Sequence, residues 1–196
     1  MMKLLLKLKH WHLFLIVVVI PFGIHVFNMI SMFTNEILVD TTGPDLTFEY
    51  MKWMPLIMVL AYGGLFGWQW AVANKLNKHL PEGFKMNLTR FKIFFFFPLV
   101  YMVFFMAFFF LMFSGGKDIF PEGNFIIFFV LIGIFHLFSM FCLIHNIQFI
   151  AKSYKAVQLQ RAVQVGDYIG EFLLIFFWFV GIWFIQPKIN ELVEKN

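Results

Sequence analysis

Residues 125–150 read FIIFFVLIGIFHLFSMFCLIHNIQFI and contain no Asp, Glu, Lys or Arg. A helix of this length extends about 39 Å, at about 1.5 Å per residue. That exceeds the roughly 30 Å hydrocarbon core of a bilayer, and a helix buried in a water-soluble protein rarely carries so long an uncharged run. The stretch therefore predicts a transmembrane helix.

Further apolar segments lie on both sides of this stretch. We expect additional spans at residues 11–33, 53–72, 93–113 and 169–186. The chain is 61% hydrophobic and 13% charged, whereas soluble domains are about 25% charged. Because the loops are too short to hold a soluble domain, we predict one all-α domain over residues 1–196, a polytopic helical bundle of about five transmembrane helices.

The fifth segment allows two interpretations. Its strictly apolar part, residues 172–185, extends only about 21 Å as a helix, which is shorter than the hydrocarbon core. Extended to 169–186, with Glu171 near the headgroups, it reaches the length of a short span, and we predict this arrangement. The alternative is a re-entrant hairpin that returns the chain to the cytoplasm.

The basic residues are distributed unequally between the loops. With a cytoplasmic N-terminus and five spans, eleven of the 15 Lys and Arg residues lie inside and four lie outside. This is the positive-inside pattern, and it predicts a multi-pass protein of the bacterial inner membrane. The same pattern explains the pI of about 9.2, because these residues face anionic lipid. We therefore expect no nucleic-acid partner.

Several local features carry structural predictions. Pro21 is expected to kink the first helix, and Trp68-Gln69-Trp70 to form an interfacial aromatic belt. Helix-forming residues continue after the fourth span, which predicts a cytoplasmic helical extension over residues 151–165 that stops at Gly166. We expect this extension to be available to lipid or to a partner.

Five polar residues inside or beside the spans form the candidate site, because polar groups are costly within a membrane. They are His25, Asn28, His136, His145 and Glu171. Each histidine is predicted to be a structural hydrogen-bonding residue, with a proton relay or a metal site as the alternative. His136 and His145 are half a turn out of phase, so we do not expect them to face one cavity.

Two further features concern contacts between helices. If the fourth and fifth segments are neighbours, His145 or Lys152 is predicted to pair with Glu171, as an anchor or alternatively as a pH sensor. Three small residues on the second span, namely Gly63, Gly64 and Gly67, allow another backbone to approach closely. We expect them to support internal helix packing, with homodimerisation as the alternative.

Motifs of nucleophilic hydrolases, metalloproteases, phosphate-binding loops and dinucleotide-binding folds are absent from the sequence. No cluster of Cys and His has metal-ligand spacing. We therefore predict a protein that is not an enzyme and that has no cofactor and no metal. The expected partners are the lipid bilayer and either other membrane subunits or further copies of the chain.

Two stretches resemble a family of small polytopic inner-membrane proteins of Gram-negative bacteria to which no activity is attached. They are residues 76–98, which begin LNKHLP, and residues 169–190, which contain IGEF and GIWFIQPKIN. The resemblance covers about a third of the chain and supports the membrane location. It implies no functional residues.

The leading functional hypothesis is a non-enzymatic accessory or interaction subunit of an inner-membrane complex. The alternative is a small transporter or proton-linked carrier that uses His25, His136 and Glu171. Such a carrier requires the three residues to line one water-accessible cavity. A third possibility, an enzyme acting on lipid, requires a cleft in which at least two polar residues converge.

Overall fold

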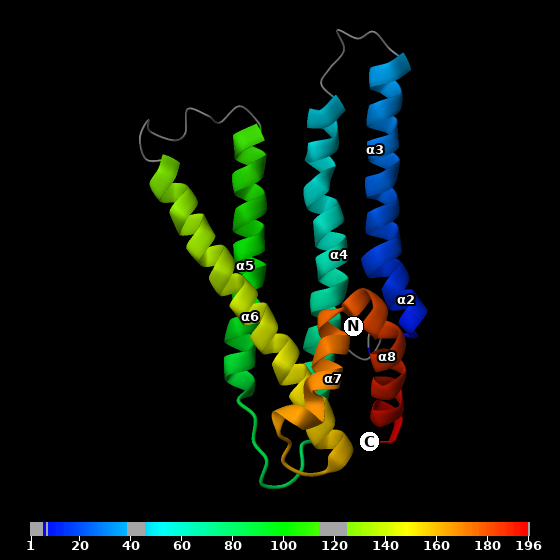
Figure 1. Ribbon diagram of the computed structural model, residues 1–196, viewed down its shortest axis with the longest axis vertical. Helices are drawn as coiled ribbons and strands as arrows, with labels where there is room; N and C mark the ends of the chain where they lie inside the picture. Colours follow the sequence, from blue (N-terminus) through cyan, green and yellow to red (C-terminus); the bar gives the residue numbers. More distant parts are fainter. Residues whose placement is uncertain (1–5, 7, 39–45, 114–124, 196) are drawn as a thin grey trace.

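The protein is a set of long helices. The computed structural model describes residue 6 and residues 8–38, 46–113 and 125–195, and no strand occurs in these ranges. The elements, shown in Figure 1, are α2 (His10–Phe14), the π-helical turn η1 (Leu15–Val19), α3 (Ile20–Leu38), α4 (Leu46–Asn77), α5 (Leu88–Phe113), α6 (Phe125–Leu159), α7 (Val165–Phe176) and α8 (Trp178–Lys195). The predicted all-α class is confirmed.

Three helices are long and apolar enough to cross a membrane. They cover His10–Ser31, Leu88–Phe108 and Ile127–Leu159. These segments coincide with the first, third and fourth predicted spans, so the chain has the helices of a membrane protein. α4 contains the second predicted span and is 32 residues long. The total of five spans stays a prediction.

The distortion expected at Pro21 takes the form of a π-helical turn. Proline lacks an N–H, and its ring collides with the carbonyl group four residues earlier, here that of Val17. The π-helical turn η1 contains Val17 and ends just before Pro21. The N–H of Ile20 donates to the carbonyl oxygen of Leu15, five residues back. This wider turn accommodates proline within one continuous helix from α2 to α3.

The fifth segment is not one helix. α7 ends at Phe176, and Phe177 adopts φ −88° and ψ 54°, outside the helical region. α8 then runs back alongside α7 as a hairpin (Figure 1). The two helices approach so closely that a Cβ on Gly181 would overlap the backbone of Leu174. The predicted single helix over 169–186 is therefore wrong, and the hairpin has the shape of the re-entrant alternative.

Burial explains why the hairpin forms. A 14-residue apolar helix is too short to cross the hydrocarbon core, whereas α7 and α8, of 12 and 18 residues, can each bury one face against the rest of the chain. Ile175, Ile182 and Ile185 are buried on this inner side. Phe176, Phe177 and other large apolar side chains at the tip are about half exposed, as expected of residues that face lipid.

The extension of α6 is shorter than predicted and is part of the core. The helix ends at Leu159, and Gln160 has a φ of +51°, so the chain leaves the helix in the left-handed conformation. Gly166 does not stop this helix, because it lies in the first turn of α7. Ala156 and Val157 are buried in the core cluster. The first part of the extension is therefore largely buried, whereas Gln158, Leu159 and most residues of the following turn are exposed, and its availability to lipid or to a partner stays a prediction.

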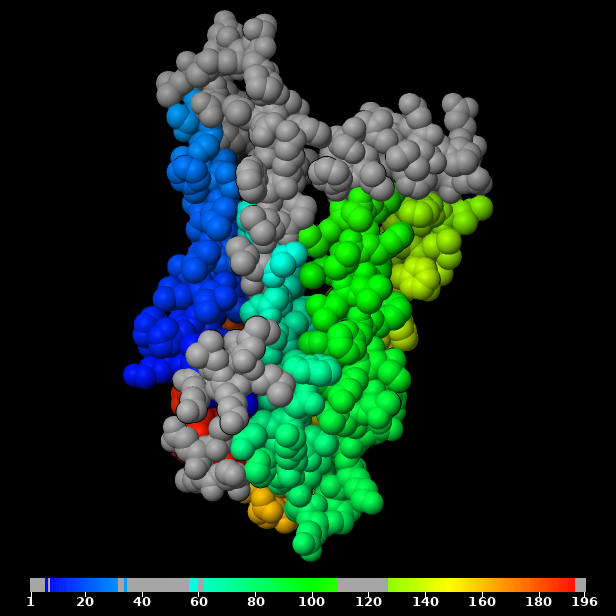
Figure 2. Space-filling view, turned by 180° about the vertical axis from the view of Figure 1, so that it is seen from behind, coloured from blue at the N-terminus to red at the C-terminus, as the bar shows by residue number. Residues whose placement is uncertain are grey.

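The core occupies one end of the molecule. The α4–α5 connection, the end of α6 and the α7–α8 hairpin meet there (Figure 1). Seen from behind, the lower halves of α4 and α5 form one continuous surface, and the first half of α6 projects beyond α5 (Figure 2). Trp68, Phe91 and Tyr154 are among the largest buried side chains of the core. The end that the sequence predicts to be cytoplasmic is thus the best packed.

Candidate functional site

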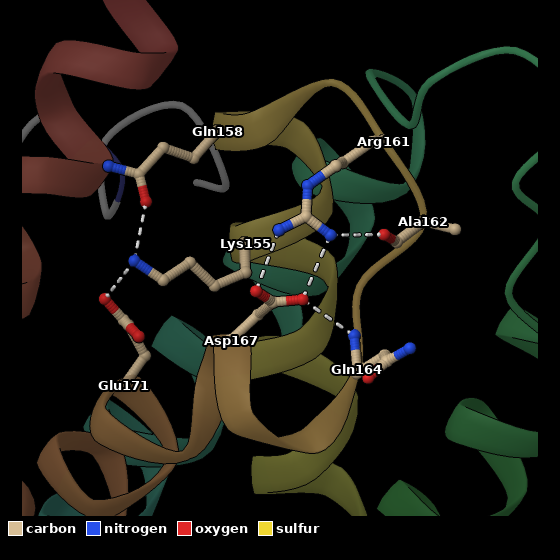
Figure 3. Close-up of polar contacts among 7 residues, drawn as sticks. All are labelled: Lys155, Gln158, Arg161, Ala162, Gln164, Asp167 and Glu171. Carbon is tan, nitrogen blue, oxygen red and sulfur yellow. Dashed lines mark hydrogen bonds and ion pairs between the residues drawn. The ribbon is translucent and has the colours of Figure 1, made fainter.

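Glu171 lies buried between α6 and α8. Its Oε1 is 2.9 Å from Nζ of Lys155 and 3.9 Å from Nζ of Lys188, and its side chain is 8% exposed. Nζ of Lys155 also donates to Gln158 (Figure 3). The prediction that His145 or Lys152 pairs with Glu171 is wrong, although the two helices are neighbours. Nζ of Lys152 instead lies 5.6 Å from the ring centre of Phe84, in the connection between α4 and α5.

A second ion pair closes the turn between α6 and α7. Arg161 donates to both carboxylate oxygens of Asp167, at 2.8 and 3.1 Å, and the same carboxylate accepts the backbone N–H of Gln164 at 2.9 Å (Figure 3). The hydrogen bonds from Arg161, followed by the one from Gln164, hold the pKa of the Asp167 carboxyl below its usual value. Asp167 thereby caps the start of α7.

A buried polar cluster connects the N-terminal segment to α4 and α8. Nε1 of Trp68 donates to Oε1 of Gln186 at 2.6 Å, and Nε2 of Gln186 donates to the carbonyl oxygen of Leu8 and to Oδ1 of Asn190. Trp68 and Gln186 are fully buried. The interfacial role predicted for Trp68 is therefore wrong. No local pattern could reveal these contacts, because the partners are 118 residues apart in the sequence.

His136 lies on an exposed part of α6. The oxygen of Tyr101 on α5 is 3.3 Å from Nδ1 of His136, yet the histidine remains exposed. Between residues 127 and 141 only Ser139 is buried. Gly133, one turn before His136, is also exposed, and a Cβ on it would meet no atom within 4 Å.

His145 lies in a different environment from His136. Its ring packs edge-on against Phe94 of α5, with ring centres 4.7 Å apart. Both histidines therefore contact α5 despite their half-turn offset, because α6 crosses α5 obliquely (Figure 1). The two histidines contact α5 at different positions along its length. Of the two, only His145 lines the cavity described below. The prediction that they share no cavity agrees with this arrangement.

His25 and Asn28 lie on α3, apart from the other candidates. His25 is exposed and Asn28 is half-buried. α4 stands between α3 and the pair formed by α5 and α6 (Figure 1). The structure therefore does not bring His25 together with His136 or Glu171, as one carrier site would require.

The glycines of α4 differ in their surroundings. A Cβ on Gly64 would lie 2.8 Å from Val17 and 3.3 Å from Ile16, both of η1. Gly64 is thus the point of close helix contact, in agreement with the predicted internal packing. Gly63 faces open space, and Gly67 is half-buried.

A cavity of about 280 Å³ opens between the start of α5 and the end of α6. It is lined by basic and polar side chains together with Met86 and Phe149, and the polar members are Lys85, Asn87, Arg90, His145, Gln148 and Lys152. None of the described residues that line it is a carboxylate. The sequence indicated only part of this group, through the polar residues that end the fourth span.

Within the residues that the structure describes, no three His, Cys, Asp or Glu side chains are grouped to hold a metal ion. No protein family, no curated protein and no solved structure matches this chain. The family resemblance noted in residues 76–98 and 169–190 therefore stays a prediction.

Proposed function

We propose that this chain is a non-enzymatic accessory subunit that binds a transmembrane helix of another membrane protein along α6. The observation that carries the proposal is the position of His136. It is a polar residue within an apolar span, it lies within hydrogen-bonding distance of Tyr101, and it belongs to a stretch of α6 that is mostly exposed in the part of the chain that the structure describes.

Membrane physics favours a protein partner on this face. Hydrocarbon offers no hydrogen bond to an imidazole, whereas a second helix can. Gly133, His136 and Met140 follow one another at helical spacing, and all three are exposed. A glycine in open space beside a polar residue lets a partner backbone approach closely enough to bond to the histidine.

The interaction can be tested by photo-crosslinking in native membranes. A benzophenone amino acid at Met140 is expected to give one discrete product with another protein, and Gly133→Leu should remove most of it by blocking the close approach. The same probe at Phe27 on α3, which is 70% exposed, is the matched control and should not give that product. A product between two copies of this chain, or one that Gly133→Leu leaves unchanged, contradicts the proposed subunit role.

We further infer a location in the bacterial inner membrane, with the N-terminus in the cytoplasm and the α7–α8 hairpin inserted from the cytoplasmic side. The antiparallel course of the hairpin (Figure 1) supports this inference. Charge supports it too, because moving Lys188 and Lys195 to the cytoplasmic side leaves only two of the 15 basic residues outside.

Single-cysteine labelling tests this topology. In a Cys142→Ser background, Lys195→Cys is expected to react with a membrane-impermeant maleimide only in inverted vesicles. Lys78→Cys should also react only in inverted vesicles. Lys117→Cys should instead react in intact cells. Labelling of Lys195→Cys from outside would show that the fifth segment crosses the membrane.

The other functional hypotheses receive less support from the geometry. The carrier needs His25, His136 and Glu171 in one cavity, and these residues lie on separate parts of the bundle. An enzyme acting on lipid needs converging polar groups, and the basic cavity provides them. However, no serine, cysteine or carboxylate lines that cavity, so a nucleophile and a general base of these types are missing from its wall.

A further inference from the structure

The cavity between α5 and α6 concentrates positive charge. Lys85, Arg90 and Lys152 contribute three cations to its wall, and His145 adds an imidazole. Among the residues that the structure describes, none of the three cations forms an ion pair with a carboxylate. Like charges repel one another, so a cluster of this kind is stabilised when an anion binds to it.

Aromatic contacts hold two of these cations in place. The guanidinium carbon of Arg90 lies 5.3 Å from the ring centre of Phe94, and Nζ of Lys152 lies 5.6 Å from that of Phe84. Such cation–π contacts restrict the side chains without neutralising them. The cations therefore need little reordering before they bind an anion, which lowers the entropic cost of binding.

Backbone dipoles add to the same field. α5 is a helix of 26 residues that begins at Leu88, and Oδ1 of Asn87 caps it by accepting the N–H of Arg90 at 2.9 Å. The positive end of this helix dipole thus lies at the cavity. Nδ1 of His145 is buried and finds no hydrogen-bond partner within the described ranges.

We propose that this cavity binds a phosphate group, with the headgroup phosphate of an anionic phospholipid as the favoured source. In the topology proposed above, the cavity lies at the cytoplasmic end of the apolar spans of α5 and α6, where lipid headgroups are expected. A volume of about 280 Å³ is large enough for a phosphate with a small alcohol. Basic pockets between helices at this level are a known way to bind anionic headgroups.

The test uses the full chain in a neutral detergent and counts bound lipid by native mass spectrometry. Phosphatidylglycerol is expected to bind at least about tenfold more tightly than phosphatidylcholine with the same acyl chains, since several charge-assisted hydrogen bonds form only with the anionic lipid. The double variant R90Q/K152Q should lose about that factor. The matched control, K75Q/K78Q, removes the same charge from the end of α4 and should bind phosphatidylglycerol within about twofold of the wild type.

Two further measurements distinguish a lipid phosphate from a soluble phosphate and supply a substitute variant. Competition by millimolar inorganic phosphate would identify a soluble phosphate as the ligand, whereas its absence would assign the site to the lipid. If R90Q/K152Q does not purify as a folded protein, K85Q carries the test, because Lys85 is exposed. Equal binding of the two lipids, or an equal loss in R90Q/K152Q and K75Q/K78Q, would overturn the proposal.

Discussion

Gly181→Ala is expected to destabilise the protein by about 3 kcal/mol, near the upper end of overpacking substitutions. A Cβ built on Gly181 would overlap the carbonyl group of Leu174. Backbone atoms cannot rotate away as the end of a flexible side chain can. α7 and α8 must therefore separate, and this separation disturbs the buried side chains that both helices share.

The free energy of unfolding in mixed micelles of dodecyl maltoside and dodecyl sulfate measures this loss. Gly170→Ala is the matched control, because Gly170 lies in α7 and a Cβ on it meets no atom within 4 Å. Alanine is favoured over glycine within a helix by roughly 0.5–1 kcal/mol, so this variant should be unchanged or slightly more stable. Equal stability of the two variants would contradict the close α7–α8 contact.

Lys155→Met is expected to cost about 3 kcal/mol, because it leaves the buried carboxylate of Glu171 without its close partner. Nζ of Lys188 remains, but it lies 3.9 Å away on a side chain that is 46% exposed. A methionine keeps the apolar stem of the lysine and removes only its charge. The loss of stability therefore measures the effect of leaving the Glu171 carboxylate unpaired and not the effect of creating a cavity.

A double-mutant cycle separates this effect from simple packing. Adding Glu171→Leu to Lys155→Met removes the unpaired charge, so the double variant should regain most of the lost stability. The exposed pair provides the comparison. Arg161 and Asp167 have side chains that are 55% and 23% exposed, and Arg161→Gln should cost less than about 1 kcal/mol. Additive losses in the cycle would show that Glu171 and Lys155 do not stabilise one another.

The membrane class and the positions of the long helices could be predicted from the chain alone. An uncharged run such as residues 125–150 has few stable alternatives to a helix in lipid, because a bilayer satisfies no backbone hydrogen bond. The bounds were less predictable. α4 begins at Leu46, before the predicted span at residues 53–72, since polar residues beyond the hydrocarbon remain good helix formers, and α6 ends at Leu159, before the predicted end of its extension.

The partners of the polar residues could be predicted only in part. Glu171 was identified as unusual from its place at the edge of an apolar run, but its partner was assigned incorrectly. Lys152 and Lys155 lie two and five residues past the apolar part of α6, which ends at Ile150, and only the rotation of that helix against α7 decides which of them meets Glu171. Gln186 gave no signal, because its contacts with Trp68 and Leu8 depend on the folded chain.

The amino-acid sequence by itself determined that this is an all-α membrane protein, where its long apolar helices run, and which loops carry the positive charge. These properties follow from the free energy of transferring each segment into lipid, which depends on local composition. Only the tertiary structure decided that the fifth segment folds back at Phe177, that Lys155 pairs with Glu171, and that three cations surround one cavity. Each of these depends on how helices rotate and cross, and lipid contributes little to that choice because it solvates every apolar face about equally.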